Sequence, residues 1–336
     1  MVSEQAAALH ESALVIDSHN DSIVIHMRAG LNLDGGPVRE QGAAIVTRFS
    51  RYNGAPIQLD FPKMRAAGVN AAFFAVDVTL AKGTHLQYAL DGLGFFLREA
   101  AHSSEEIVIV RRAADITRAH EEGKLAAVLA IENSDGLDQS IYTLSAFYEI
   151  GVRALTVTHS TRSWAADGCE VENGGGLTAF GKRMIAEMNR LGMLVDVSHL
   201  NDRGFWETLE HSTMPVMATH SCCRALCGHP RNLTDDQLKA LGAAGGVVAL
   251  TFVPEFIDDA APTIDGLIDH IEHAIEKAGI DHVALGSDFD GGGTLVEGAM
   301  TYPQITELLL QRGLAEDDVR KILGTNHLRI LSEVIG

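Results

Sequence analysis

Short apolar runs recur along the chain, and each is followed by a longer stretch in which apolar residues return at helical spacing. The runs are rich in Val, Ala and Leu and are nearly continuous, as is typical of parallel strands buried on both faces. We therefore predict eight strands, at Leu14–Asp17, Asn70–Val78, Ala126–Ile131, Ala154–Thr158, Leu194–Ser198, Pro215–Thr219, Gly246–Thr251 and His282–Gly286.

The stretches between these strands carry the signals of helices. Phe180, Met184 and Met188 recur on one helical face, and Thr234 is followed three residues later by Gln237, the spacing of a capping box. Alternation of strand and helix repeated eight times predicts a (β/α)₈ barrel. An open, doubly wound sheet also alternates strands with helices and is the alternative to the barrel.

Two segments fall outside this simple count. Residues from about 30 to 60, after the first strand, contain glycines and are irregular, and we expect a small hairpin near Ala44–Phe49. The apolar run Ile107–Val110 predicts a short extra strand outside the eight. Long insertions after barrel strands usually form walls over an active site. Since no linker or repeat interrupts the pattern, we expect residues 1–336 to form a single barrel domain.

Composition excludes several kinds of partner. The formal net charge of −19 argues against nucleic acid, which is bound through clusters of Lys and Arg. No apolar run approaches the ~20 residues that a membrane span needs, so we expect no membrane partner. The first residues lack the pattern of a secretory signal, and the spacing of the cysteines is unlike a disulfide framework. The sequence thus predicts a cytoplasmic protein with reduced thiols, at Cys169, Cys222, Cys223 and Cys227.

Imidazole or carboxylate side chains follow six of the eight predicted strands. Because the carboxyl ends of barrel strands meet at one face, these side chains should converge. A single histidine at a strand end would be weak evidence, but a carboxylate such as Glu132 after an apolar strand is costly unless it is paired or bound to metal. The converging residues are His19 with Asp21, Glu132, His159, His199, His220 and Asp288.

Other histidines fit less demanding interpretations. His270 and His273 lie at helical spacing among acidic residues, which is typical of a solvated helix face. We therefore expect neither of them at the metal site.

The residues that end the strands, with their neighbours, resemble the renal (membrane) dipeptidase family, a branch of the amidohydrolase superfamily. The resemblance extends nearly from end to end, from the Val15–Asp21 segment to the Asn326–Arg329 segment. The most specific stretches are Leu59–Arg65, Leu155–Ser160 with Trp164, Glu187–His199, His220-Ser221 leading into Arg231–Leu233, and Gly286–Gly291.

The resemblance implies a (β/α)₈ TIM barrel of the metal-dependent amidohydrolase type with two Zn²⁺ per chain. His19 and Asp21 would bind the first ion, His199 and His220 the second, and Glu132 would bridge the pair together with a water or hydroxide. Nitrogen and oxygen ligands without thiolate suit hydrolytic zinc. Two cations that share a water lower its pKa toward neutrality and supply a hydroxide nucleophile.

The resemblance also implies roles around the substrate. His159 would polarise the scissile carbonyl, and Arg231 would hold the substrate carboxylate through its planar guanidinium. Asp288 would transfer the proton and lie near the substrate amine. The expected activity is hydrolysis of small unblocked dipeptides, including those with a D-residue at the C-terminal side, by a homodimer.

The chain departs from the family at two segments. Ala75–Val78 replaces a Tyr-containing segment after the second strand, and Thr251–Pro254 replaces an Asn-Phe-Tyr stretch after the seventh. Both lie where substrate side chains would pack. A binuclear-zinc amidohydrolase for N-acyl amino acids, cyclic amides or lactones is the second hypothesis. A barrel that binds metal or peptide without turnover is the third.

Overall fold

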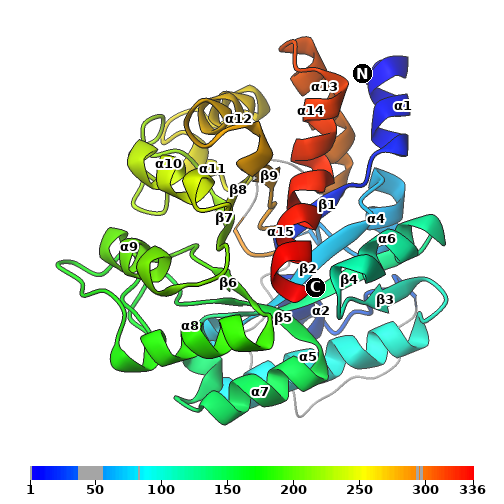
Figure 1. The fold of residues 1–336 in the computed structure, drawn as a ribbon. Coiled ribbons are helices and arrows are strands. Elements are labelled where there is room, and N and C mark those ends of the chain that lie inside the picture. Colours follow the sequence, from blue (N-terminus) through cyan, green and yellow to red (C-terminus); the bar gives the residue numbers. More distant parts are fainter. Residues whose placement is uncertain (1, 37–55, 82–83, 293–294, 296–297) are drawn as a thin grey trace.

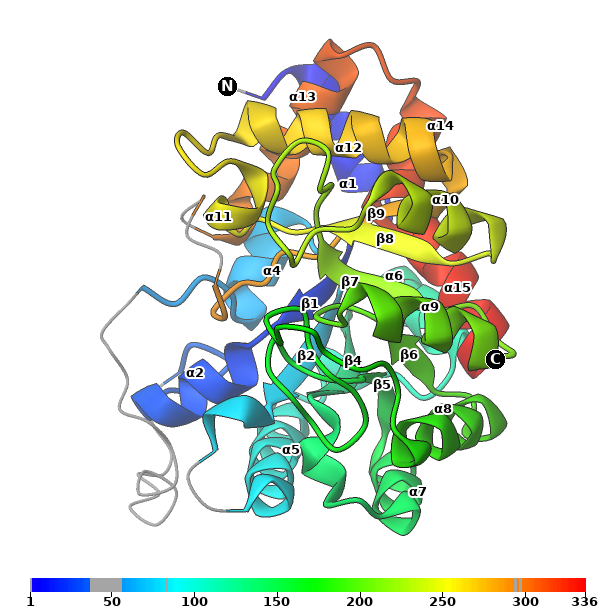
Figure 2. The ribbon, with the colours of Figure 1, turned by 90° about the vertical axis from the view of Figure 1, so that its left-hand side faces the viewer.

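A ring of parallel strands surrounded by helices forms the protein (Figures 1 and 2). The computed structural model describes residues 2–36, 56–81, 84–292, 295 and 298–336. In sheet order, the ring consists of β1 (Ile16–Asn20), β2 (Ala71–Asp77), β4 (Leu125–Glu132), β5 (Val152–Thr156), β6 (Leu194–Asp196), β7 (Met217–Ser221), β8 (Val247–Leu250) and β9 (Val283–Leu285).

Every neighbouring pair in this ring is parallel. A bridge between Asn20 and Phe289 joins the end of β1 to the segment after β9, which nearly closes the ring. The short strand β3 (Ile107–Ile109) pairs with β4 outside it. The predicted eight-stranded barrel and its extra strand are therefore confirmed, and the open sheet is wrong. The hairpin expected near Ala44–Phe49 lies outside the described residues.

Helices cover the outside of the ring between successive strands (Figure 2). They are α1 (Glu4–Ser12), α2 (Ser22–Ala29), α4 (Phe61–Ala67), α5 (His85–His102), α6 (Ala113–Glu121), α7 (Ile141–Ile150), α8 (Ala179–Leu191), α9 (Asp202–His211), α10 (Asp235–Ala243), α11 (Pro254–Ile257), α12 (Ile264–Ala278), α13 (Tyr302–Gln311), α14 (Glu316–Arg320) and α15 (Asn326–Ile335). The capping box predicted at Thr234 and Gln237 begins α10, and Phe180, Met184 and Met188 form the buried face of α8. No helix within the described ranges is long and apolar enough to cross a membrane.

The strands are buried on both faces, and their side chains alternate between two cores. Outward residues of β2 and β4 pack under the helices, whereas the inward residues fill the barrel. The inward series are Ala71, Phe73 and Ala75 on β2, and Ala126, Val128 and Ala130 on β4. The next inward positions are Asp77 and Glu132, which are cross-strand neighbours. The interior thus changes from apolar to acidic at the carboxyl ends of the strands.

The opposite end of the barrel is covered by the last helix. In Figure 1, α15 (red) lies across the middle of the ring, and its apolar residues join the inner core. The backbone N–H of Ala113, at the start of α6, donates a hydrogen bond to the carbonyl of Gly336 and ties down the end of the chain. The inward series of β2 and β4 therefore end in polar side chains at the carboxyl end of the barrel.

Candidate metal centre

Four strand ends bring one carboxylate and three imidazoles together around a common centre. Oε1 of Glu132 lies 3.0 Å from Nε2 of His199 and 3.5 Å from Nε2 of His220. Its other oxygen, Oε2, lies 3.6 Å from Nε2 of His19, which in turn lies 3.7 Å from Oδ2 of Asp21. Each oxygen of Glu132 therefore faces a different pair of potential ligands.

The donor set fits cations at two positions. The ligand atoms of His19, Asp21 and Glu132 lie within 4.8 Å of one another, and so do those of Glu132, His199 and His220. Nε2 of His19 and Oδ1 of Asp21 are buried, with no hydrogen-bond partner among the described residues. A buried polar atom without a partner costs about 1–3 kcal/mol. Coordination of a cation would satisfy both atoms.

The two histidines of the second group have their other ring nitrogens occupied. Nδ1 of His199 lies 3.0 Å from Oγ of Ser160, and Nδ1 of His220 lies 2.8 Å from Oγ1 of Thr219. Their Nε2 atoms lie 2.9 Å apart and face the centre. Partners of this kind fix the orientation of a metal-binding imidazole.

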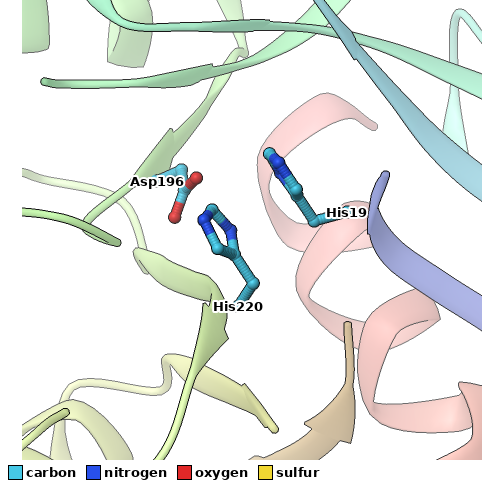
Figure 3. A group of neighbouring side chains, drawn as sticks. All are labelled: His19, Asp196 and His220. Carbon is cyan, nitrogen blue, oxygen red and sulfur yellow. The ribbon is translucent and has the colours of Figure 1, made fainter. Parts of the chain in front are cut away.

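Asp196 also lies against this centre, next to His220 and His19 (Figure 3). Its carboxylate already accepts four hydrogen bonds, at 2.6 to 3.0 Å, from the backbone N–H groups of Ser198 and Thr219 and the hydroxyls of Thr156 and Thr219. The single hydroxyl hydrogen of Thr219 is donated in the hydrogen bond to Asp196. The hydroxyl oxygen of Thr219 must therefore accept a hydrogen bond from the N–H at Nδ1 of His220. Asp196 thus leaves Nε2 of His220 unprotonated, as a metal ligand requires.

Burial controls the charges of the imidazoles. It lowers the pKa of His199 and His220 well below the usual value, and the positive charge of Arg231 acts in the same direction. Burial also opposes protonation of His19, but the carboxylates of Glu132 and Asp21 outweigh it and raise the pKa of that imidazole. The centre therefore attracts positive charge on the side of His19 and offers neutral imidazoles on the other side.

Carboxylates gather in the same region. Burial raises the pKa of Glu132, Asp77 and Asp288, and the nearby charge of Asp21 raises all three further. Crowded acidic groups of this kind favour the entry of cations.

His159 and Arg231 lie beside the centre. The ring of His159 stacks on that of His199, with centroids 4.0 Å apart. Burial, followed by the charge of Arg231, lowers the pKa of His159 to about 4, so its imidazole is neutral near pH 7. The guanidinium of Arg231 is buried, donating to the carbonyl of His220 (2.8 Å) and to Oγ of Ser221 (3.2 Å), while its buried Nε finds no partner in the described part of the chain. These contacts fix the positively charged guanidinium of Arg231 beside the centre.

Asp288 is placed by a link between the first and last strands. Oδ1 and Oδ2 of Asp17 accept hydrogen bonds from the backbone N–H and the hydroxyl of Ser287, at 2.8 and 2.7 Å. The next residue, Asp288, adopts a left-handed backbone conformation (φ 61°), and its N–H donates to the carbonyl of His19. Burial raises the pKa of Asp17 to about 6. We call the contact between Asp17 and Ser287 the seam of the barrel.

The structure brings all eight site residues predicted from the sequence to the carboxyl end of the barrel. Six of them are buried there, while His159 and Asp288 are partly exposed. The sequence reasoning assigned no role to Asp17 or Asp196. Both are carboxylates within apolar runs, a signal that could have pointed to them.

The chain is similar to proteins of one family over almost its whole length. The sequence pattern of the membrane dipeptidases (Peptidase family M19) matches residues 3–335. A protein called dipeptidase tcpJ, from Claviceps purpurea, is 34% identical over 304 residues, which are 85% of this chain and 72% of that protein.

Solved structures agree with this similarity. A metallopeptidase of family M19 called dipeptidase AC superposes with a TM-score of 0.84 and 26% identity, covering 97% of this chain and 99% of that one. A metallopeptidase from Rhodobacter sphaeroides, solved with a phosphinate mimic of the dipeptide L-Ala-D-Ala, gives a TM-score of 0.83 and 25% identity, covering 96% of this chain and 99% of that one.

Proposed function

This chain belongs to the membrane dipeptidase family, and from that premise we propose that it is a two-zinc dipeptidase that cleaves small unblocked dipeptides. Membership of this family makes the protein a metal-dependent hydrolase on a barrel of the amidohydrolase type. The observation that supports the two-ion proposal is Glu132, whose two oxygens face separate ligand pairs. We assign His19 and Asp21 to one ion and His199 and His220 to the other.

The residues around the centre would divide the work of amide hydrolysis. The two ions, when bound, supply a shared water of near-neutral pKa and positive charge for the developing oxyanion. His159 is neutral at pH 7 and can donate one N–H to the carbonyl oxygen. Asp288 can take the proton of the attacking water and return it to the leaving amine, because burial raises its pKa and favours holding that proton.

Arg231 would bind the C-terminal carboxylate of the substrate. Its guanidinium is buried, is fixed against β7 and still has an unpartnered Nε–H within the described structure. A fixed site for a carboxylate beside the metal centre favours short substrates. The mimic of L-Ala-D-Ala bound to the Rhodobacter relative supports the inclusion of dipeptides with a D-residue at the C-terminal side.

A screen of L,L, L,D and D,L dipeptides with zinc-loaded protein tests the proposal. We expect turnover of at least one class, and none by the His199→Ala variant, which loses a ligand of the second ion. Turnover no higher than that of His199→Ala for every dipeptide would refute the activity. Metal analysis should find two zinc ions per chain in protein never exposed to chelator, and fewer than one would refute the two-ion site.

The second hypothesis keeps the metals and changes the substrate to N-acyl amino acids, cyclic amides or lactones. It draws on the two segments that depart from the family, which contain Asp77 and Val253. Hydrolysis of an N-acyl amino acid by protein that leaves all dipeptides intact would establish it. A non-catalytic barrel is the least supported hypothesis, because a binder needs neither His159 nor Asp288 beside its metals.

A further inference from the structure

Asp77 is a carboxylate at the carboxyl end of the barrel that neither proposed metal position uses. It ends the inward series of β2, beside Glu132 on β4, and is 7% exposed. One of its oxygens, one of Glu132 and a ring nitrogen of His159 lie within 4.8 Å of one another. The carboxylate of Asp77 thus lies close to both Glu132 and His159.

The surroundings of Asp77 call for a cation. Its carboxylate is buried next to that of Glu132, its cross-strand neighbour. A buried carboxylate among other carboxylates is costly until a positive group pairs with it. His159 is neutral at pH 7 and cannot provide that charge.

The backbone around Asp77 holds its carboxylate in place. Oδ1 accepts a hydrogen bond of 2.8 Å from the backbone N–H of Thr79, which lies in the short helix η1 (Val78–Leu80). The hydroxyl of Thr79 accepts in turn from Nδ2 of Asn133, the residue after Glu132. A charged group fixed by such contacts is suited to recognition.

Asp77 and Arg231 stand on opposite sides of the barrel. Arg231 donates to the carbonyl of His220 on β7, whereas Asp77 ends β2. In the sheet order, β2 and β7 are four steps apart in both directions around the eight strands. The residues that would hold the metals lie on or just after β1, β4, β6 and β7, so they extend from the strands beside Asp77 to the strand beside Arg231. A dipeptide zwitterion has the matching arrangement, with its carboxylate and its ammonium at opposite ends and its amide between them.

We propose that Asp77 binds the free α-ammonium group of the substrate and so restricts the enzyme to dipeptides with an unblocked N-terminus. The inference rests on the proposed dipeptidase function and deepens it. Asp288 cannot hold the ammonium throughout the reaction, because it loses its negative charge when it takes a proton from water. Asp77 takes no part in that transfer and remains the partner of the cation.

A pair of substrates isolates this role. Alanyl-alanine and lactyl-alanine differ only in an ammonium or a hydroxyl at the N-terminal end. For the Asp77→Asn variant we expect kcat/KM for alanyl-alanine to fall about 100-fold, as when one partner of a buried ion pair is removed. The value for lactyl-alanine should change by less than about 3-fold, because a hydroxyl forms no ion pair with either side chain.

Asp290→Asn is the matched control. Asp290 is a second, largely enclosed carboxylate close to Asp21, but it accepts hydrogen bonds from Ser22 and the backbone N–H of Gln58. Its loss removes the same charge from the region and should affect both substrates by the same factor. If Asp77→Asn fails to fold, as judged by its melting curve, Asp77→Ser takes its place.

Binding and metal content provide readouts besides turnover. Calorimetry with a phosphinate mimic of alanyl-alanine should show weakened binding to Asp77→Asn, whereas the mimic with a hydroxyl in place of the amine should bind both proteins alike. The zinc content should stay at the wild-type value. Equal losses for both substrates, unchanged discrimination, or a lost metal ion would each overturn the inference. Wild-type protein that cleaves neither substrate would instead refute the proposed function, and this inference with it.

Discussion

At the scale of single residues, the second metal position depends on which nitrogen of His220 carries the proton. The hydroxyl of Thr219 links that imidazole to Asp196 and leaves Nε2 free to bind an ion. The Thr219→Val variant keeps the shape of the side chain but removes this link. We expect zinc at the second position to bind about 10- to 100-fold more weakly, as for other lost partners of metal-binding histidines.

Competition with a chromogenic chelator measures this change. Thr219→Ser retains the hydroxyl and should restore the affinity. Equal affinity in the valine and serine variants would contradict the role of the hydroxyl.

The residues that converge at the candidate metal centre could be predicted from the sequence, because a carboxylate or imidazole that follows a buried apolar strand is costly unless it is paired or binds a metal. The residues that hold these side chains in place could not be predicted from the sequence. Asp196 and Asp17 act through hydrogen bonds to residues far along the chain, such as Thr219 and Ser287. The expectation of a solvated face at His270 is wrong. That side chain is buried between the N–H of Cys223 and the carbonyl of Ile257, contacts that helical spacing cannot indicate.

At the scale of elements, the seam joins β1 to the segment after β9 through side chains. The Ser287→Ala variant deprives the buried carboxylate of Asp17 of one hydrogen bond. We expect it to lower the free energy of unfolding by about 1–3 kcal/mol. Urea titration at pH 7 measures the change. Ser12→Ala, on the exposed face of α1, should change it by less than about 0.5 kcal/mol, and equal effects of the two would contradict the importance of the seam.

The packing of α15 on β9 makes stability depend on pH. Nε2 of His327 lies 3.0 Å from the carbonyl of Leu285, and burial lowers the pKa of the imidazole from 6.5 to about 4. The unfolded chain therefore takes up this proton between pH 6.5 and 4, while the folded chain does not. The contribution of the neutral His327 imidazole to the free energy of unfolding is therefore present above pH 6.5 and is lost as the pH falls toward 4.

The His327→Gln variant cannot lose that contribution. Its difference from the wild type in the free energy of unfolding should therefore shrink by up to about 3 kcal/mol between pH 7 and pH 4. Guanidinium titrations at several pH values in that interval measure it. A difference that stays constant across the interval would show that His327 does not titrate as its burial implies.

The strands could be predicted to within a few residues, since continuous apolar runs mark them. The irregularities in the pairing of the strands could not be predicted from the sequence. The pairing shifts between Asp17 and Asn20 on β1 and between Ala218 and Ser221 on β7, the two stretches that contain His19 and His220. A run of apolar residues contains no signal for such a shift, because both faces of the strand are buried.

At the scale of the whole molecule, neither hydrophobic core contains a residue of the candidate metal centre. The residues inside the ring and beneath the helices are apolar, and the metal centre occupies only the carboxyl end. Removal of metal by a chelator should therefore leave the far-UV circular dichroism unchanged while lowering the melting temperature, because ligands that bind only the folded state stabilise it.

Addition of zinc should restore the melting temperature, as differential scanning calorimetry would show. Loss of the far-UV signal on chelation would contradict an independently folded barrel.

The homodimer and the cytoplasmic location expected from the sequence stay predictions, as does the single domain over residues 1–336.

The seam has a consequence for how the chain is made. Asp17 and Ser287 are 270 positions apart. At a synthesis rate of about 5–20 residues per second, Ser287 follows Asp17 from the ribosome after roughly 15–50 s. During that interval β1 can pair only on its β2 side, and its other edge stays open to foreign strands. The first strand to emerge is thus the last to be enclosed, and the growing chain needs protection until about its final sixth arrives.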